Sequence, residues 1–117
     1  MKHVLFPLAE LAPGQMRAVV VDKVKIVVMR TPDGDLRALR DSCSHYGARL
    51  SDGTIEPMVV GEGVGSYRIE PGAFVLRCPW HGYEFDVISG RCPADPSHER
   101  VRAYQVEVED GSVVLQR

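Results

Sequence analysis

The chain has 117 residues, 44% of them hydrophobic, and its 14 Lys and Arg against 16 Asp and Glu give a formal net charge of −2. This composition suits one domain, residues 1–117, which buries roughly 65% of its unfolded surface and leaves no room for a second. The near-balanced charge argues against general nucleic-acid binding. The longest apolar stretches, 19–21 and 26–29, are far too short to span a bilayer.

The first seven residues have one Lys and a brief apolar run, without the apolar segment and cleavage site of a secretory signal. We therefore expect a cytoplasmic protein without a membrane anchor.

Turn signals are frequent along the chain, and helix signals are nearly absent. Apolar and alternating runs predict strands at 4–8, 17–21, 25–30, 36–41, 75–77, 83–87, 101–109 and 112–116. Turns are expected at 11–14, 22–23, 31–34, 88–91 and 110–111. Many short, evenly spaced strands predict an all-β fold, either an antiparallel β sandwich or a small barrel.

The alternation in 101–109 makes a specific prediction about burial. Arg102, Tyr104, Val106 and Val108 form the more apolar face, which should face the core.

A glycine-rich stretch lies within residues 54–73. It does not fit a nucleotide-binding loop, because no strand-to-helix context surrounds it and no Lys-Ser or Lys-Thr follows. We interpret it as a hairpin in which 58–60 turns at the glycines into 66–69. This hairpin is either a passive surface element or a docking element for a partner.

Two short motifs carry the chemistry of the chain, Cys43-Ser44-His45-Tyr46-Gly47 and Cys78-Pro79-Trp80-His81-Gly82. Each offers one thiolate and one imidazole, and the glycine that follows can take a positive φ close to a bound group. The 32 residues between His45 and Cys78 should place the two motifs at the tips of separate hairpins.

These residue types leave three alternatives open. The four side chains are ordinary loop residues, or they form a structural Cys2His2 zinc site. In the third alternative they hold a [2Fe–2S] cluster, with two thiolates on one iron and two histidines on the other.

The two motifs, with Leu50 after the first, resemble the Rieske iron–sulfur signature. The likeness continues through Phe85-Asp86 and Ser89-Gly90-Arg91 into residues 102–111, and it covers roughly 19–115. It implies antiparallel sheets with two cluster-binding loops at one end.

The resemblance also implies one [2Fe–2S] cluster per chain, held by Cys43, His45, Cys78 and His81. The cluster-binding part would span about 42–90. The spacer between the motifs is longer than the family's usual one, so 54–73 would be an added hairpin.

The cysteine positions indicate which branch of the family the chain resembles. Respiratory members carry an extra, paired cysteine in each loop, but Arg49 or its neighbours and Trp80 stand at those places here. The chain instead resembles the low-potential, oxygenase-associated branch. The third cysteine, Cys92, has no partner for an intrachain disulfide and is expected to be a small, semi-buried loop residue.

The expected cluster has closed iron coordination, so one-electron transfer is its natural function. Rieske potentials lie at about −150 to +300 mV, against about −400 mV for all-cysteine plant-type clusters. High-potential relatives have Ser and Tyr hydroxyl donors two and four residues after the second histidine. Tyr83 and Phe85 occupy those places here, which predicts a potential in the low part of the range.

Catalysis by this chain alone is not expected. A ring-hydroxylating oxygenase also needs a mononuclear iron with two histidines and one carboxylate. Only His3 and His98 remain, at opposite ends of the chain. No catalytic residue is therefore assigned, and His3 and His98 are expected in a strand or terminus and in a loop.

The resemblance favours a stand-alone, monomeric ferredoxin that carries electrons from a flavin reductase to a terminal oxygenase. One alternative is a small Rieske subunit of a larger oxidoreductase such as nitrite reductase. Another is a structural or regulatory metal-binding module.

Overall fold

The computed structural model describes residues 1–43, 48–61, 65, 67–79, 82–93 and 100–117. Nine strands and two short 3₁₀ helices, Leu8–Glu10 and Leu50–Asp52, make up the regular structure of this part of the chain. The strands are β1 Lys2–Pro7, β2 Met16–Val21, β3 Val24–Arg30, β4 Leu36–Arg40, β5 Thr54–Gly61, β6 Tyr67–Arg77, β7 Glu84–Asp86, β8 Ala103–Glu109 and β9 Ser112–Gln116. The all-β prediction is confirmed.

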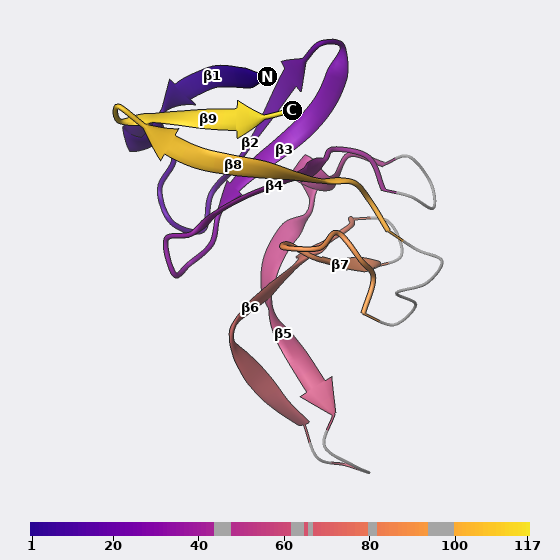
Figure 1. Cartoon of the computed structure of the whole chain (residues 1–117). Helices are drawn as coiled ribbons and strands as arrows, with labels where there is room; N and C mark the ends of the chain where they lie inside the picture. The colour runs from indigo at the N-terminus through magenta and orange to yellow at the C-terminus, as the bar shows by residue number, and fades with distance from the viewer. Residues whose placement is uncertain (44–47, 62–64, 66, 80–81, 94–99) are drawn as a thin grey trace.

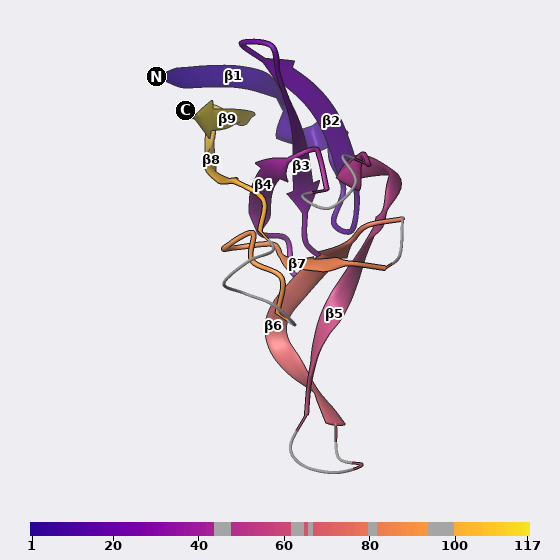
Figure 2. The same cartoon turned by 90° about the vertical axis from the view of Figure 1, so that its right-hand side faces the viewer.

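The strands form two antiparallel sheets. A six-stranded sheet has the order β1-β9-β8-β4-β3-β2, and a three-stranded sheet has the order β5-β6-β7. The six-stranded sheet curls round at one end of the molecule, with both termini beside each other, and β5 and β6 extend away from it (Figures 1 and 2). This projecting pair accounts for the elongated shape, 47 × 28 × 21 Å.

Side chains bring the two edge strands of the large sheet, β1 and β2, together. The Arg17 guanidinium on β2 lies 4.6 Å from the ring centroid of Phe6 on β1. At the other end of these strands, Asp22 lies 3.6 Å from His3 and 3.4 Å from Arg117. The sheet is therefore nearly closed, as a small barrel.

The core consists of two apolar clusters that share β3. The inter-sheet cluster lies between the two sheets and contains Val27, Met29, Leu39, Cys43, Leu50, Leu76, Cys78, Phe85, Val87, Cys92 and Val101. The large-sheet cluster lies within the curl of the six strands and contains Phe6, Leu11, Val21, Ile26, Val28, Leu36, Ala38, Val113 and Leu115. The run 26–29 is continuously apolar because alternate side chains of β3 enter different clusters and all four are fully buried.

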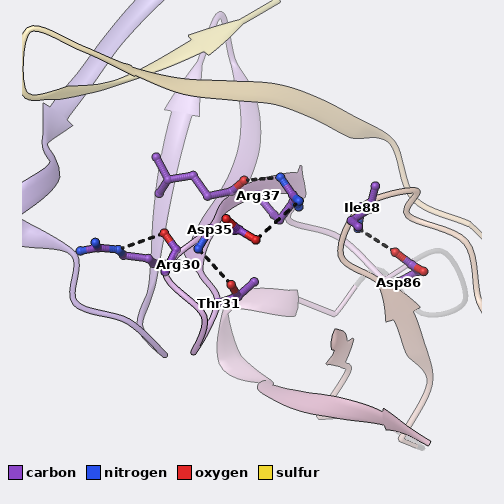
Figure 3. Close-up of polar contacts among 8 residues, drawn as sticks. Arg30, Thr31, Asp35, Arg37, Asp86 and Ile88 are labelled. Carbon is purple, nitrogen blue, oxygen red and sulfur yellow. Dashed lines mark hydrogen bonds and ion pairs between the residues drawn. The ribbon is translucent and has the colours of Figure 1, made fainter. Parts of the chain in front are cut away.

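The turns follow the residues predicted for them. Asp22 and Lys23 both have positive φ, 49° and 68°, as does Asp110 at 51°, so each of these two-residue turns matches the right-handed twist of its strands. Between β3 and β4, the Gly34 N–H donates to the Thr31 carbonyl at 2.8 Å. The Thr31 hydroxyl also accepts from the Asp35 N–H at 3.1 Å (Figure 3).

The prediction for 101–109 is only partly right. Tyr104 and Val106 pack against the large-sheet cluster, but Val108 is 44% exposed, and Val101 from the opposite face is 7% exposed. The reason is that this segment passes both clusters in turn. Its first residues, Val101 and Ala103, contact the inter-sheet cluster, whereas Val108 lies beyond the part of β8 that pairs with β4.

The long β5–β6 hairpin has two distinct parts. Its base, where Ile55 pairs with Leu76, is joined by β7 on the other side of β6. Its outer half, where Val59 pairs with Ile69, is two-stranded and projects from the body of the molecule (Figure 1). The pairing agrees with the hairpin expected from the glycine-rich stretch.

Within the described residues, no helix has the length and apolar character needed to cross a membrane.

Candidate metal centre

The two cysteines of the motifs lie at the roots of two loops. Cys43 follows β4, and its N–H donates to the Ala48 carbonyl at 2.7 Å. Cys78 follows β6, and its N–H donates to the Tyr83 carbonyl at 2.7 Å. Each hydrogen bond joins the two ends of a loop. Each cysteine is therefore held at the point where a strand ends and a loop begins.

Both cysteines belong to the inter-sheet cluster, where Cys43 is 2% exposed and Cys78 is 1% exposed. Neither forms a disulfide. Two thiols in one apolar cluster, carried by strands of different sheets, fit a shared metal site, since thiolates are soft ligands for iron–sulfur clusters and zinc. Burial of this kind would also keep water away from the sulfur atoms.

A buried carboxylate anchors the first loop. The Asp41 side chain, two residues before Cys43, is 1% exposed. It accepts hydrogen bonds from the Ser51 N–H at 2.7 Å and the Ser51 hydroxyl at 2.6 Å. The loop is therefore fixed at both ends, before the cysteine and after Leu50. Asp41 was not among the residues predicted for the site. An acidic residue at the end of a strand, directly before a ligand motif, was the available signal.

A close backbone approach joins the first loop to the second. A Cβ placed on Gly53 would lie 1.9 Å from the Arg77 carbonyl oxygen, one residue before Cys78. Only glycine permits this contact, and because the φ of Gly53 is −91°, the reason is space and not a left-handed backbone. The position thus links the segment after Leu50 directly to the strand that carries Cys78.

The strand that leaves the second loop ends in a tight turn. The Asp86 carboxylate accepts from the Ile88 N–H at 2.8 Å (Figure 3). It also accepts from the Ser89 N–H at 3.2 Å. Gly90 has φ +76°, and a Cβ there would lie 2.1 Å from the Val101 carbonyl oxygen. The Asp86 carboxylate therefore caps this turn, and Phe85 and Val87 on either side of it lie in the same buried cluster as the two cysteines.

The residues around the cysteines are largely apolar. Phe85 is fully buried in the inter-sheet cluster, and Tyr83 packs against it. Cys92 is 3% exposed in the same cluster, so it is a core residue and more buried than expected.

The structure describes only part of the predicted ligand set. His45 and His81 lie outside the described residues, as do Trp80 and His98. His3 lies on β1, with its Nε2 3.6 Å from an Asp22 carboxylate oxygen, which agrees with the strand or terminal position expected for it. The two cysteines and the roots of their loops are therefore the part of the site that the structure defines.

The sequence matches the Rieske [2Fe-2S] domain over residues 1–105, and the chain belongs to this family. Its cofactor is a [2Fe–2S] cluster, one per domain. The two buried cysteines are compatible with this cluster, which takes two thiolates on one iron.

Relatives fall into two groups by length. The chain is 29% identical to apoptosis-inducing factor 3 of Mus musculus over 91% of its length, but it spans only 15% of that protein. It is 32% identical to the anthranilate 1,2-dioxygenase ferredoxin subunit of Burkholderia cepacia, over 95% of this chain and 87% of that one.

Two solved structures of matching length share the fold. The ferredoxin of carbazole 1,9a-dioxygenase from Nocardioides aromaticivorans is 28% identical, with a TM-score of 0.73 over 98% of this chain and 96% of that chain. A putative NADH-dependent nitrite reductase small subunit from Mycobacterium tuberculosis has a TM-score of 0.81 over 100% and 95%, at 21% identity, and shows the shared fold. The relatives of matching length include ferredoxin components of dioxygenase systems, and an electron-carrier role fits them.

Proposed function

We propose that this chain is a stand-alone one-electron carrier that takes electrons from a flavin reductase and passes them to a terminal oxygenase. The supporting observation is the pair of thiols, Cys43 and Cys78, buried in one apolar cluster at the roots of two loops of a Rieske domain. In this proposal His45 and His81 complete the ligand set, and the protein is a cytoplasmic monomer.

The bound cluster would supply a reversible one-electron couple with no open coordination position. The chain's own residues hold the two thiols and exclude water from them. Asp41 and Gly53 fix the segments on either side of the first motif, and the Asp86 turn fixes the end of the second.

The experiment is electron paramagnetic resonance of the anaerobically purified protein, before and after reduction, with a potentiometric titration. We expect a silent oxidised state, a reduced signal of low average g, and a midpoint in the low part of the Rieske range of about −150 to +300 mV. A colourless protein with stoichiometric zinc would overturn the proposal. A midpoint well above zero would overturn the low-potential assignment alone.

Phe85→Tyr tests the physical basis of the low potential. Phe85 is fully buried and offers no hydrogen-bond donor, whereas a hydroxyl there would stabilise the added electron if it reached a cluster sulfur. We expect the midpoint of the variant to rise. Phe85→Leu, which adds no hydrogen-bond donor, is the matched control, and its midpoint potential should not rise.

A second candidate is a small Rieske subunit of a larger oxidoreductase, such as a nitrite reductase. The outer half of the β5–β6 hairpin favours it, because Val59, Tyr67 and Ile69 are exposed by 61%, 74% and 62%. Exposed apolar groups of this kind suit a permanent interface. Gel filtration of native extract separates the candidates, since a free carrier elutes alone and a subunit elutes with its complex.

A further inference from the structure

Cationic side chains line a groove beside the first loop. Four of them, Lys23, Lys25, Arg40 and Arg49, surround a hollow of about 280 Å³, and we call these four residues and their hollow the basic groove. A second hollow of about 270 Å³ shares Lys25 and Arg49 and continues along β2. The positive charge is local, because the whole chain carries a formal net charge of −2.

The strand register explains why these side chains gather. Ile26 near the start of β3 pairs with Arg40 at the end of β4, and the Asp41 N–H donates to the Lys25 carbonyl at 2.9 Å. Lys23 belongs to the tight turn that precedes β3. Residues 15 or more positions apart in the chain therefore meet at one corner of the large sheet.

Little negative charge offsets the groove. Asp41 lines it, but its carboxylate is 1% exposed and accepts two hydrogen bonds from Ser51. Its nearest cation is Arg49, with Nε at 4.0 Å. Across the described part of the chain, Lys23, Lys25 and Arg40 are exposed and form no ion pair.

The groove adjoins the cysteine site. Ser42 lines it, and the next residue is Cys43. A macromolecule bound in the groove would therefore lie against the root of the first loop. We propose that the basic groove docks an acidic protein surface of a redox partner, which deepens the proposed function and rests on it.

The size of the groove favours a protein partner over a nucleic acid. Four cations at one corner match a small group of carboxylates, whereas a duplex presents a continuous row of phosphates that extends well beyond them. Complementary charge of this kind mainly sets orientation and association rate, and salt weakens it.

The test measures the fluorescence anisotropy of labelled octaglutamate peptide with the cluster-loaded protein at low salt. Lys25→Gln/Arg40→Gln removes two charges from the groove. Lys2→Gln/Arg37→Gln is the matched control, because it removes one Lys and one Arg at exposed or half-buried strand positions elsewhere and gives the same net charge. We expect about tenfold weaker binding for the groove variant and less than about twofold for the control.

Equal losses in both variants would overturn the proposal, because net charge alone would then explain binding. So would no measurable binding by the wild type, displacement of the peptide by millimolar inorganic phosphate alone, or tighter binding of a labelled 12-base-pair duplex with the same variant dependence. Lys23→Gln/Lys25→Gln is a second groove variant that repeats the test without touching β4.

The paramagnetic resonance spectrum of each variant separates the two proposals. A normal reduced signal together with unchanged peptide binding means that docking fails and the electron carrier stands. A missing signal in the wild type together with selective peptide binding means that the electron-carrier proposal fails and that the basic groove still binds acidic groups.

Discussion

The two ends of the β5–β6 hairpin have the same antiparallel pairing but different surroundings. At the base, Leu76 is fully buried, β7 adds a third strand, and Cys78 follows directly. In the outer half, Val59 and Ile69 face each other across two strands and are 61% and 62% exposed. Isolated two-stranded hairpins are marginal in water, whereas a third strand and an apolar face stabilise them.

This difference indicates which half of the hairpin is tightly packed and held in one geometry. The thiols occupy the end of the hairpin that is packed against a second sheet, where neighbouring backbone segments approach without room for a Cβ. In the described part of the outer half, a Cβ on Gly61 would make only ordinary contact, 3.7 Å from the Tyr67 ring. Substitutions at matched positions in the two halves should therefore have very different effects.

The largest expected effect is loss of the cluster. Cys43→Ala and Cys78→Ala each remove a proposed thiolate ligand, and iron per chain should fall from about two to near zero. Cys92→Ala is the matched control, since Cys92 lies in the same buried cluster and is not a proposed ligand. Iron and acid-labile sulfide analysis measures the result. Full iron content in Cys78→Ala would remove that residue from the ligand set.

Some features could be predicted from the sequence because they depend on local chemistry. The Asp22-Lys23 and Asp110-Gly111 turns follow from residues that adopt positive φ. The expectation that each ligand motif lies at the tip of its own hairpin is right only for the second motif, which joins the paired strands β6 and β7. It is wrong for the first, because the chain there passes from β4 of the large sheet to β5 of the small sheet. The Asp41–Ser51 contact and the Gly53 approach to Arg77 were not predictable in the same way. Both depend on how distant segments pack, and neither leaves a periodic pattern.

Val108 illustrates the same limit. Strict alternation assigned it to the core, but a strand that passes two clusters changes its surroundings along its length, and only the register with β4 shows where burial ends. The histidines of the site stay predictions from the motif, because they lie outside the described residues.

The next largest effect is expected at Gly53. Gly53→Ala would force a Cβ to 1.9 Å from the Arg77 carbonyl oxygen, so the backbone must shift, and we expect a loss of about 1–3 kcal/mol in the free energy of unfolding. Gly61→Ala, in the outer half, is the control. A Cβ there would lie 3.7 Å from the Tyr67 ring, in ordinary contact, and stability should stay the same or rise by up to about 1 kcal/mol.

Chemical denaturation of the two glycine variants measures both changes. Equal destabilisation would show that the outer half is packed as tightly as the base, and the comparison between the two ends would fail.

A smaller loss is expected from Asp41→Asn. The amide oxygen can still accept from the Ser51 N–H, and the amide nitrogen can donate to the Ser51 hydroxyl, but both bonds lose the strength that the carboxylate charge gives them, at a cost of about 1–2 kcal/mol. Because Asp41 fixes the root of the first loop, iron release to a chelator should also be faster. Asp52→Asn is the control, because the Asp52 carboxylate forms no hydrogen bond or ion pair within the described residues, and it should change neither quantity.

The smallest effect is expected in the outer half itself. Ile69→Thr should change the free energy of unfolding by no more than about 0.5 kcal/mol, because the side chain is 62% exposed in the isolated protein. On the same strand, Leu76→Ala removes a fully buried side chain and should cost about 2–5 kcal/mol. A loss above 1 kcal/mol for Ile69→Thr would mean that Ile69 in the outer half of the hairpin is buried against other residues in solution. A different result would concern the complex: the isolated Ile69→Thr variant is as stable as the wild type but no longer elutes with a larger complex from native extract. In that case the exposed residues Val59, Tyr67 and Ile69 belong to a subunit interface, and the chain is not a free carrier.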